Sequence, residues 1–285
     1  MKTGEWANAQ LYVVATPIGN LRDITLRAID VLKNVSLIAA EDTRVTMTLL
    51  RAHGVSAPMV SLHRHNERHA SEKIIATLAE GQSVALVSDA GTPAVSDPGA
   101  LLVQAVRQAG FLVTPIPGPN AAIAALSVAG LPEGGFLFYG FLPPRAGPRR
   151  EAIVQLKQLP FALVFYEAPH RIIELTEDLH TVLGNDRTIT FAREITKRFE
   201  SIHACPLGEA LEWLNGDPDR QRGEFVVIVS AGEPEADEGG EEAKRVLEIL
   251  LDAMPVSQAA SVAAKITGAR KNELYELALR MSKEG

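Results

Sequence analysis

The chain has 285 residues, of which 46% are hydrophobic, and a formal net charge of −7 at pH 7. A chain of this length can bury one large core or two modest ones, so we expect two domains and an appendage. No stretch approaches the ~20 uninterrupted apolar residues of a membrane span, and residues 1–10 lack the order of a signal peptide, so a cytoplasmic protein without membrane contact is expected. The single cysteine, Cys205, excludes an intramolecular disulfide and a cysteine-based zinc cluster.

The first part of the sequence alternates short apolar runs with amphipathic segments. The apolar runs predict buried strands at 11–15, 37–40, 59–62, 84–88 and 112–116. Helices are predicted at 25–34, through Thr48 and Leu49, from a cap at Asn66 to Gly81, from Pro98 to Gly110, and from about Asn120. This order predicts an α/β domain at residues 10–122, with a mostly parallel sheet and helices on both faces.

Polar, glycine-rich loops follow three of these strands. We call residues 16–20, 89–99 and 117–120 the first, second and third glycine-rich loops. One such loop alone would be ordinary turn chemistry. Because ligands bind at the carboxyl ends of strands in open α/β sheets, three loops at one edge predict a cleft for a small polar molecule. The sequence has neither G-x-G-x-x-G after the first strand nor G-x-x-x-x-G-K-[ST], which argues against a dinucleotide oxidoreductase or a P-loop NTPase.

A second α/β domain is predicted at residues 123–231. Its strands are expected at 136–141, 162–167, 188–192, 201–204 and 225–230, with helices between several of them. The strands after Thr188 are close enough in sequence to pair antiparallel, so this domain should contain a mixed sheet.

The end of the chain differs in composition from both domains. Residues 232–242 are rich in Gly, Glu and Asp, which predicts a solvated acidic linker. Three short helices are predicted at 243–253, 257–266 and 272–281, and Gly268 marks the turn between the last two. This spacing gives residues 243–285 a helix-turn-helix-like character. A docking or dimerisation cap and a nucleic-acid reader are equally compatible with it.

The negative net charge argues against a polyanionic partner, because affinity for nucleic acid comes largely from neutralising phosphates. The distribution of charge modifies this argument. Much of the acid lies in the predicted linker, while basic residues gather at 63–69, 145–150, 187–198 and 265–271. Scattered surface charge accounts equally well for any one of these segments.

Six motifs, in order along residues 11–230, resemble a family of bacterial small-subunit ribosomal RNA methyltransferases within the tetrapyrrole methylase superfamily. They are TPIGN at 16–20, AEDTR at 40–44, SDAGTPAVSDPG at 88–99, PGPNA at 117–121, YEAPHR at 166–171 and ARE-x-TK at 192–197. The helical tail resembles the C-terminal extension of the same proteins. Asn120 stands where many relatives carry Ser, and both side chains form hydrogen bonds.

The resemblance implies a two-domain tetrapyrrole-methylase-like α/β fold with a small helical C-terminal extension, assembled as a homodimer. It also implies that S-adenosylmethionine binds between the domains, and that the protein 2′-O-methylates a cytidine ribose in the decoding region of 16S rRNA. The expected partner is therefore 16S rRNA or the small ribosomal subunit. The loops that match the motifs supply the expected cofactor contacts: Pro17, Gly19, Asp89, Ala90, Gly91, Thr92, Ser96, Gly118 and Asn120.

Methyl transfer from a sulfonium depends mainly on alignment and on exclusion of water, with help from a general base that takes the hydroxyl proton. The candidate bases in matching motifs are Glu41, Glu67 and Glu194. A salt bridge explains Glu41 and Glu194 about equally well, and Asp42 more simply caps the following helix. The cations expected to hold RNA are Arg44, His63, Arg145, Arg149, Arg150, Arg193 and Lys197.

The histidines at 63, 65 and 69 resemble a metal cluster. Methyl transfer needs no metal, and their basic neighbours fit a loop that faces RNA better, so no metal is expected. Two other functions remain open. A tetrapyrrole methyltransferase acting on a corrin or sirohaem precursor would share the fold and cofactor but would not need the basic segments or the tail. A non-enzymatic nucleic-acid-binding regulator would leave the glycine-rich loops without a purpose.

Overall fold

The computed structural model describes residues 9–131, 134–232 and 238–284. Contacts divide the chain into two units, one of residues 1–154 and 162–230 and the other of residues 155–161 and 231–285. The first unit contains two five-stranded sheets. In the described part of the chain, no helix has the length and apolar character needed to cross a membrane.

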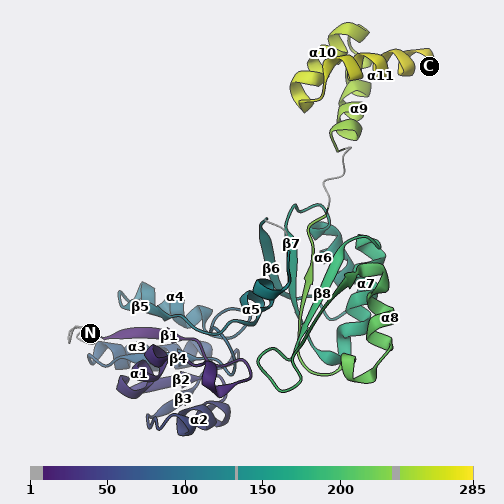
Figure 1. The fold of residues 1–285 in the computed structure, drawn as a ribbon. Helices are drawn as coiled ribbons and strands as arrows, with labels where there is room; N and C mark the ends of the chain where they lie inside the picture. The colour runs from purple at the N-terminus through teal and green to yellow at the C-terminus, as the bar shows by residue number, and fades with distance from the viewer. Residues whose placement is uncertain (1–8, 132–133, 233–237, 285) are drawn as a thin grey trace. The chain divides into compact units, whose positions relative to one another are not determined.

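The first sheet is parallel throughout, with strand order β3-β2-β4-β1-β5 (Figure 1). Its strands are β1 (Gln10–Val14), β2 (Leu37–Ala40), β3 (Met59–Ser61), β4 (Val84–Val87) and β5 (Leu112–Ile116). The helices that accompany it are α1 (Leu26–Asn34), α2 (Thr43–Ala52), α3 (Glu67–Ala79) and α4 (Ala100–Gln108), with a short 3-10 helix η1 (Leu21–Asp23). The predicted order of elements is confirmed.

Helices cover both faces of this sheet. In β4, Ala85 and Val87 pack in one cluster with residues of α1 and α2, whereas Val84 and Leu86 pack in another with residues of α3 and α4. Every residue of β4 is buried. A parallel strand covered on both faces reads as a continuous apolar run, which is why the sequence revealed this strand so clearly.

The cap of α3 and the first residue of α4 differ from the predictions. Asn66 stands at the N-cap position of α3, but its side chain bonds outside the helix: its Oδ1 accepts from the His63 N–H (2.8 Å) and its Nδ2 donates to the Ser61 carbonyl (3.0 Å). Helix α4 begins at Ala100 after Gly99, rather than at Pro98. Gly99 has φ +128°, a conformation open to glycine, and offers no side chain to cap the helix.

The second sheet is mixed, as predicted, with strand order β6-β7-β10-β8-β9. Strands β6 and β7 pair in parallel and the other pairs are antiparallel. The strands are β6 (Phe136–Phe141), β7 (Ala162–Glu167), β8 (Thr188–Arg193), β9 (Ser201–Pro206) and β10 (Phe225–Val229). The helices are α5 (Ala121–Val128), α6 (Ala146–Leu156), α7 (Ile172–Leu183) and α8 (Ala210–Asn215), with 3-10 helices η2 (Pro169–Arg171), η3 (Leu207–Glu209) and η4 (Pro218–Gln221).

Helix α5 joins the two sheets of the first unit. Its Ala122 and Ala125 are buried in one cluster with Val164 of β7 and Val226 of β10. Small side chains on this face let the helix lie close to the second sheet. Figure 1 shows α7 and α8 on the opposite face of that sheet. The third glycine-rich loop, which leads into α5, is therefore placed by both sheets.

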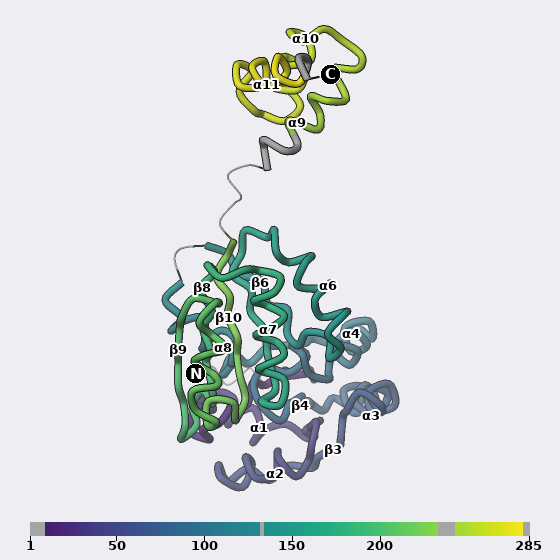
Figure 2. Tube along the Cα trace, turned by 90° about the vertical axis from the view of Figure 1, so that its right-hand side faces the viewer, coloured from purple at the N-terminus to yellow at the C-terminus, as the bar shows by residue number. Residues whose placement is uncertain are grey.

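The second unit contains helices α9 (Glu238–Leu251), α10 (Val256–Thr267) and α11 (Lys271–Glu284), at the yellow end of the trace in Figure 2. Their core includes Leu247, Ala260 and Leu274. Gly268 ends α10 in the left-handed conformation with φ +76°, as the predicted turn required. Residues 238–242, predicted as part of the linker, are helical instead, and residues 233–237 lie outside the described residues.

Candidate functional site

The three glycine-rich loops meet at the carboxyl edge of the first sheet. Thr16 and Gly91 exchange two backbone hydrogen bonds, at 2.9 and 3.0 Å, which join the first loop to the second. The Thr92 hydroxyl donates to the Pro119 carbonyl (3.2 Å) and joins the second loop to the third. These bonds fix the backbone that borders the cleft, as expected at the carboxyl ends of parallel strands.

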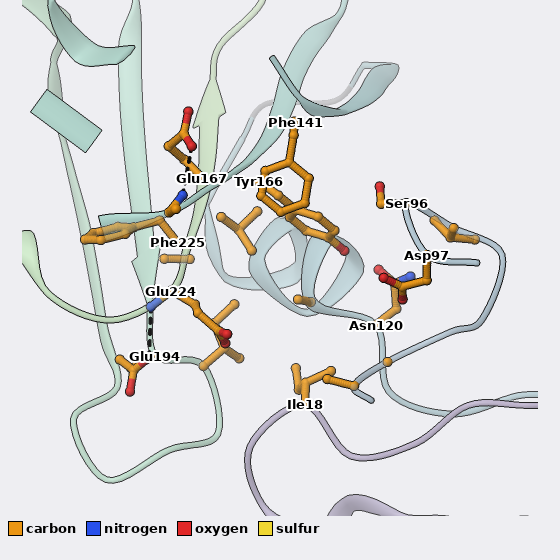
Figure 3. A pocket seen from close by; sticks show the side chains of 18 of the residues that line it. Ile18, Ser96, Asp97, Asn120, Phe141, Tyr166, Glu167, Glu194, Glu224 and Phe225 are labelled. Atoms are coloured by element: carbon orange, nitrogen blue, oxygen red, sulfur yellow. Dashed lines mark hydrogen bonds between the residues drawn. The ribbon is translucent and has the colours of Figure 1, made fainter. Parts of the chain in front are cut away.

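The three loops, the first of them through Ile18, enclose with the second sheet a pocket of ≈ 360 Å³ (Figure 3). This volume lies within the range of small-molecule sites. Five of the nine predicted cofactor contacts line it: Ala90, Gly91, Thr92, Ser96 and Asn120. The other four, Pro17, Gly19, Asp89 and Gly118, do not line it.

Two of the glycines that do not line the pocket allow the loops to pack closely against neighbouring segments. A Cβ on Gly19 would lie 2.4 Å from Cγ of Lys197 and 3.1 Å from the Ile195 carbonyl, so Gly19 lets the first loop approach the segment after β8. A Cβ on Gly118 would lie 3.0 Å from Cβ of Ala15 at the end of β1. Both glycines therefore support the walls of the pocket instead of forming its surface.

One wall of the pocket is aromatic. Phe141 and Tyr166 make an edge-to-face contact with ring centroids 5.7 Å apart, and both side chains line the cavity. The Tyr166 hydroxyl accepts from the Ala122 N–H (3.3 Å), and burial raises the pKa of this phenol. The wall offers a flat apolar surface beside polar groups, which suits a ligand with an aromatic ring.

The charged side chains of the lining are mainly acidic. It includes the carboxylates of Asp97, Glu167, Glu194 and Glu224, and among the described lining residues Lys197 is the one cationic side chain. Lys197 Nζ donates to Glu194 (2.9 Å) and to Glu224 (2.7 Å), so its charge is shared between two carboxylates. Figure 3 shows Asp97 beside Asn120 on one side of the pocket and Glu194 and Glu224 on the other. The pocket as a whole therefore favours a cationic ligand.

Asp97 is the site residue that the sequence did not single out. Burial, followed by the negative charge of Glu41, raises its pKa to about 6, and Arg64 opposes this shift. Arg64 also binds the second loop, because its Nη2 donates to the Ser96 carbonyl (3.0 Å). An aspartate in a common turn sequence gives no sign of such an environment before folding. A carboxylate with a perturbed pKa in a cleft is a candidate for proton transfer.

Glu41 is not part of the pocket lining. Its Oε2 accepts from the Asp89 N–H (3.3 Å), and the Asp89 Oδ1 in turn accepts from the Asp42 N–H (2.9 Å), so these carboxylates tie the end of β2 to the end of β4. Burial raises the pKa of Glu41. Asp42 also caps α2 through the Arg44 N–H (2.8 Å), as predicted. Glu41 does not line the cavity, so its influence on the pocket acts through Asp97 and Asp89.

Glu67 does not line the pocket, so the structure gives no support to the prediction that it acts as a base. Glu67 is buried, and its Oε1 accepts from the N–H groups of Gly99 (3.0 Å), Leu101 (2.9 Å) and Leu102 (3.2 Å). It thereby supplies the cap that Gly99 cannot supply to α4. A carboxylate at a helix N-terminus also meets the positive end of the helix dipole.

Replacement of Glu67 tests whether this residue serves as a helix cap or as a catalytic base. Glu67→Ala should lower the free energy of unfolding by about 2–4 kcal/mol, because it leaves three N–H groups, two of them buried, without their acceptor. Glu67→Gln keeps an oxygen acceptor and should cost less. Denaturant unfolding measures both values. Methyl transfer by folded Glu67→Gln should stay close to wild type, and a loss of several hundred-fold would restore Glu67 as a base.

Glu194 lines the pocket but is poorly suited to accept a proton. Burial raises its pKa, but the hydrogen bond from the Glu224 N–H (2.9 Å) and the Lys197 ammonium outweigh this effect and leave the pKa lowered. Glu194 also adopts φ +53°, and Gly223 faces its side chain where a Cβ would clash. These contacts give Glu194 a role in fixing the loop after β8.

Arg149 does not face RNA, and this prediction is wrong. Its side chain is 2% exposed, its Nε donates to Asp178 (2.5 Å) and its Nη2 donates to Glu174 (3.3 Å). Arg150 donates to the other oxygen of Asp178, with 53% of its side chain exposed. Arg145 is exposed. The basic segment before and within α6 is therefore partly a structural ion-pair network with α7.

Arg149→Ala should destabilise the protein by about 3–5 kcal/mol, because it removes the buried partner of the Asp178 carboxylate and leaves it only the half-exposed Arg150. Arg145→Ala, an exposed change in the same segment, should stay within about 0.5 kcal/mol of wild type. Urea unfolding measures both. Equal stability of the two variants would mean that Arg149 is not an integral part of the core.

The remaining predicted cations lie in varied surroundings. Arg44 pairs with Asp42 (2.6 Å), and hydrogen bonds from Arg44 lower the pKa of Asp42 to about 2. Arg193 donates to the Ser201 hydroxyl (3.1 Å) and the Arg222 carbonyl (3.2 Å). His63 is exposed at the start of the basic segment 63–69. Within the described ranges, no three His, Cys, Asp or Glu residues are grouped to hold a metal ion.

A parallel sheet and a mixed sheet around one pocket define the architecture of the tetrapyrrole methylases. The profile of the tetrapyrrole (corrin/porphyrin) methylase family matches residues 10–211, and that of the RsmI C-terminal HTH domain matches residues 237–282. Among solved structures, the methyltransferase CobJ is 21% identical with a TM-score of 0.60, over 79% of this chain and 95% of that chain. The uroporphyrin-III C-methyl transferase of Thermus thermophilus, complexed with S-adenyl homocysteine, is 19% identical with a TM-score of 0.54, over 78% of this chain and 97% of that chain.

Relatives of closer sequence define the family more narrowly. The ribosomal RNA small subunit methyltransferase I of Escherichia coli O157:H7 is 48% identical over 96% of this chain and 96% of the relative. The protein of the same name from Pseudomonas aeruginosa is 49% identical over 95% of this chain and 96% of the relative. The chain therefore belongs to the ribosomal RNA small subunit methyltransferase I family of the tetrapyrrole methylases.

Proposed function

We propose that this protein transfers a methyl group from S-adenosylmethionine to ribosomal RNA, and that the acceptor is the 2′-hydroxyl of a cytidine in the decoding region of 16S rRNA. The observation that carries the proposal is the acidic, partly aromatic pocket at the carboxyl edge of the parallel sheet, in a chain of this family. The substrate is 16S rRNA or the small ribosomal subunit, which places the protein in the cytoplasm.

The residues present fit this cofactor. S-adenosylmethionine carries a sulfonium and an ammonium, and it supplies an electrophilic methyl group when bound. The carboxylate of Asp97 has the charge to face a cation, and the rings of Phe141 and Tyr166 suit the adenine. Ala90 and Gly91 bring backbone groups to the pocket surface, where they can hold the polar end of the ligand.

The proton of the ribose hydroxyl needs an acceptor. Asp97 lines the pocket and has a pKa of about 6, so it is ionised at neutral pH and still basic enough to take up a proton. Glu41 is the second candidate, and it acts on the pocket through its charge on Asp97. The apolar wall of Phe141 and Tyr166 limits the access of water to the same space.

A homodimer is part of the proposal. Helix α5 leaves Ile123 and Val128 more than half exposed (54% and 56%), although its other face is buried. Exposed apolar side chains on a short, largely apolar helix suit a contact with a second copy of the chain. Light scattering of the purified protein tests this part independently of activity.

The test of the proposed function uses small ribosomal subunits from cells that lack the enzyme. Incubation with the purified protein and S-adenosylmethionine should place one 2′-O-methyl group on a decoding-region cytidine, detected by mass spectrometry of nuclease fragments. Methylation of a base, or of another region, would leave the family assignment standing and refute this acceptor. Methylation of a tetrapyrrole precursor instead of RNA would favour the alternative of corrin or sirohaem synthesis.

A further inference from the structure

The loop that joins β8 to β9, residues 194–200, has one side in the pocket and the other in solvent. Glu194, Ile195 and Lys197 line the pocket. Arg198 and Phe199 follow at once and are exposed, and 64% of Phe199 is accessible. One residue, Arg198, separates Lys197 from Phe199, and two steps along the chain reach at most about 7 Å. The loop therefore carries an exposed aromatic ring to the rim of the pocket.

This loop is held in one conformation. Glu194 and Thr196 have φ +53° and +65°, values that a residue other than glycine rarely adopts, and least of all a β-branched one. The Thr196 N–H donates to Glu200 (2.6 Å) and the Glu194 N–H donates to the Glu224 carbonyl (3.0 Å). Backbone strain that the surroundings stabilise tends to occur where a site needs a fixed geometry.

The neighbouring loop fits against it closely. Gly19 of the first glycine-rich loop has no room for a Cβ, because Thr196 Oγ1 and Lys197 Cγ would lie 2.9 and 2.4 Å away. After this contact the first loop continues to Leu21, which is 44% exposed, and to Arg22, which is also exposed. The ring of Phe199 is thus carried by a loop that is fixed on both sides.

The surroundings of Phe199 indicate the ligand. The Arg198 guanidinium lies 5.5 Å from the centroid of the Phe199 ring, and Glu200 beside it is exposed. An exposed aromatic ring between charged sequence neighbours, with an arginine beside it, differs from the continuous apolar surface of a protein interface. Unpaired bases of RNA stack on such rings, and arginine adds both stacking and charge.

We propose that Phe199, flanked by Arg198, is a stacking platform for an unpaired RNA base next to the nucleotide that enters the pocket. This inference rests on the proposed function, because it requires an RNA substrate. The platform would hold the strand while the pocket holds the reacting ribose. It would contribute to RNA affinity and leave the binding of S-adenosylmethionine unchanged.

The test compares Phe199→Ala, Phe199→Trp and a control, Phe136→Ala. Phe136 is also exposed (47%), but it lies at the amino end of β6, whereas the pocket residue Phe141 ends that strand. The probe is a short fluorescein-labelled single-stranded RNA, with fluorescence anisotropy as the readout. Phe199→Ala should weaken RNA binding by about 5- to 150-fold, the range for loss of one stacked base. Phe199→Trp should bind as well as wild type, and so should Phe136→Ala.

A second probe, the same RNA with abasic residues, separates stacking from charge. Wild type and Phe199→Ala should bind abasic RNA equally, because no base is left to stack. The platform would be overturned if Phe199→Ala bound normal RNA as tightly as wild type, or if it lost as much affinity for abasic RNA as for normal RNA. It would also be overturned if the substitution converted a dimer to a monomer. Failure of wild type to bind RNA would overturn it as well. RNA binding without methyl transfer would instead refute the proposed function and leave the platform supported.

Discussion

Gly91→Val should lower the affinity for S-adenosylmethionine by about 100-fold, because Gly91 occupies a conformation that valine adopts only under strain. Gly91 has φ +80°, and its Cβ position lies 3.4 Å from Ile18 Cγ2. It also exchanges two backbone hydrogen bonds with Thr16 and lines the pocket. Strain of about 1–3 kcal/mol at such a position must either distort the loop or break these bonds. Either change moves the pocket surface, and calorimetric titration measures the result.

Gly110→Val is the matched control. Gly110 has φ +85°, almost the same backbone conformation, and nothing lies within 4 Å of its Cβ position. This variant should lose a similar amount of stability and keep its affinity for S-adenosylmethionine. If folded Gly91→Val bound the cofactor as tightly as wild type, the second glycine-rich loop would not be a cofactor site.

Local chemistry made much of the fold predictable. The strand β4 was visible because a parallel strand buried on both faces is a continuous apolar run. The starts of α1, α2 and α5 were visible because Thr25, Asp42 and Asn120 cap them with their own side chains. In each case the cause and its effect lie within a few residues of one another.

The predictions for Glu67 and Arg149 differ from the structure because the partners of these residues lie far away in the sequence. Glu67 caps α4 from the start of α3, and its acceptor role depends on Gly99, 32 residues further on. Arg149 pairs with Asp178 across 29 residues, so a sequence that looked like a basic surface became a buried ion pair. A charged residue shows its type in the sequence, but its burial and its partner appear only after folding.

Asp97 illustrates the same limit at the site itself. The pKa of Asp97 is raised by burial and by the charge of Glu41. Glu41 follows strand β2 and precedes Asp97 by 56 residues in the sequence (97 − 41). The sequence placed both residues in matching motifs, but only Glu41 was among the predicted bases. The structure favours Asp97 because Asp97 lines the pocket and Glu41 does not.

Asp97→Asn should lower single-turnover methyl transfer by about 100- to 10,000-fold at saturating cofactor and small ribosomal subunits, the range for loss of a general base. Wild-type kcat/KM, which reports the ligand-free enzyme, should rise with pH through about 6, where Asp97 loses its proton, and then level off. Stability should change in the opposite direction. The folded-state pKa lies above the ordinary value of 3.8, so this group stabilises the fold below pH ~4 and the contribution is lost as the pH rises through about 6. Asn imitates the protonated form, so the variant should be more stable than wild type at pH 8.

Glu41→Gln distinguishes the two carboxylates. Removing the charge of Glu41 should lower the pKa of Asp97, because that charge is one of the causes of its rise. The acid limb of the pH–rate profile should therefore move to lower pH, while the rate on the plateau stays within about threefold of wild type, far above the loss expected for a missing base. A plateau rate reduced about 100-fold or more in Glu41→Gln, together with a nearly normal Asp97→Asn, would assign the base to Glu41. In that case Asp97 would serve the cationic cofactor alone, and its replacement would weaken the binding of S-adenosylmethionine without changing the rate at saturation.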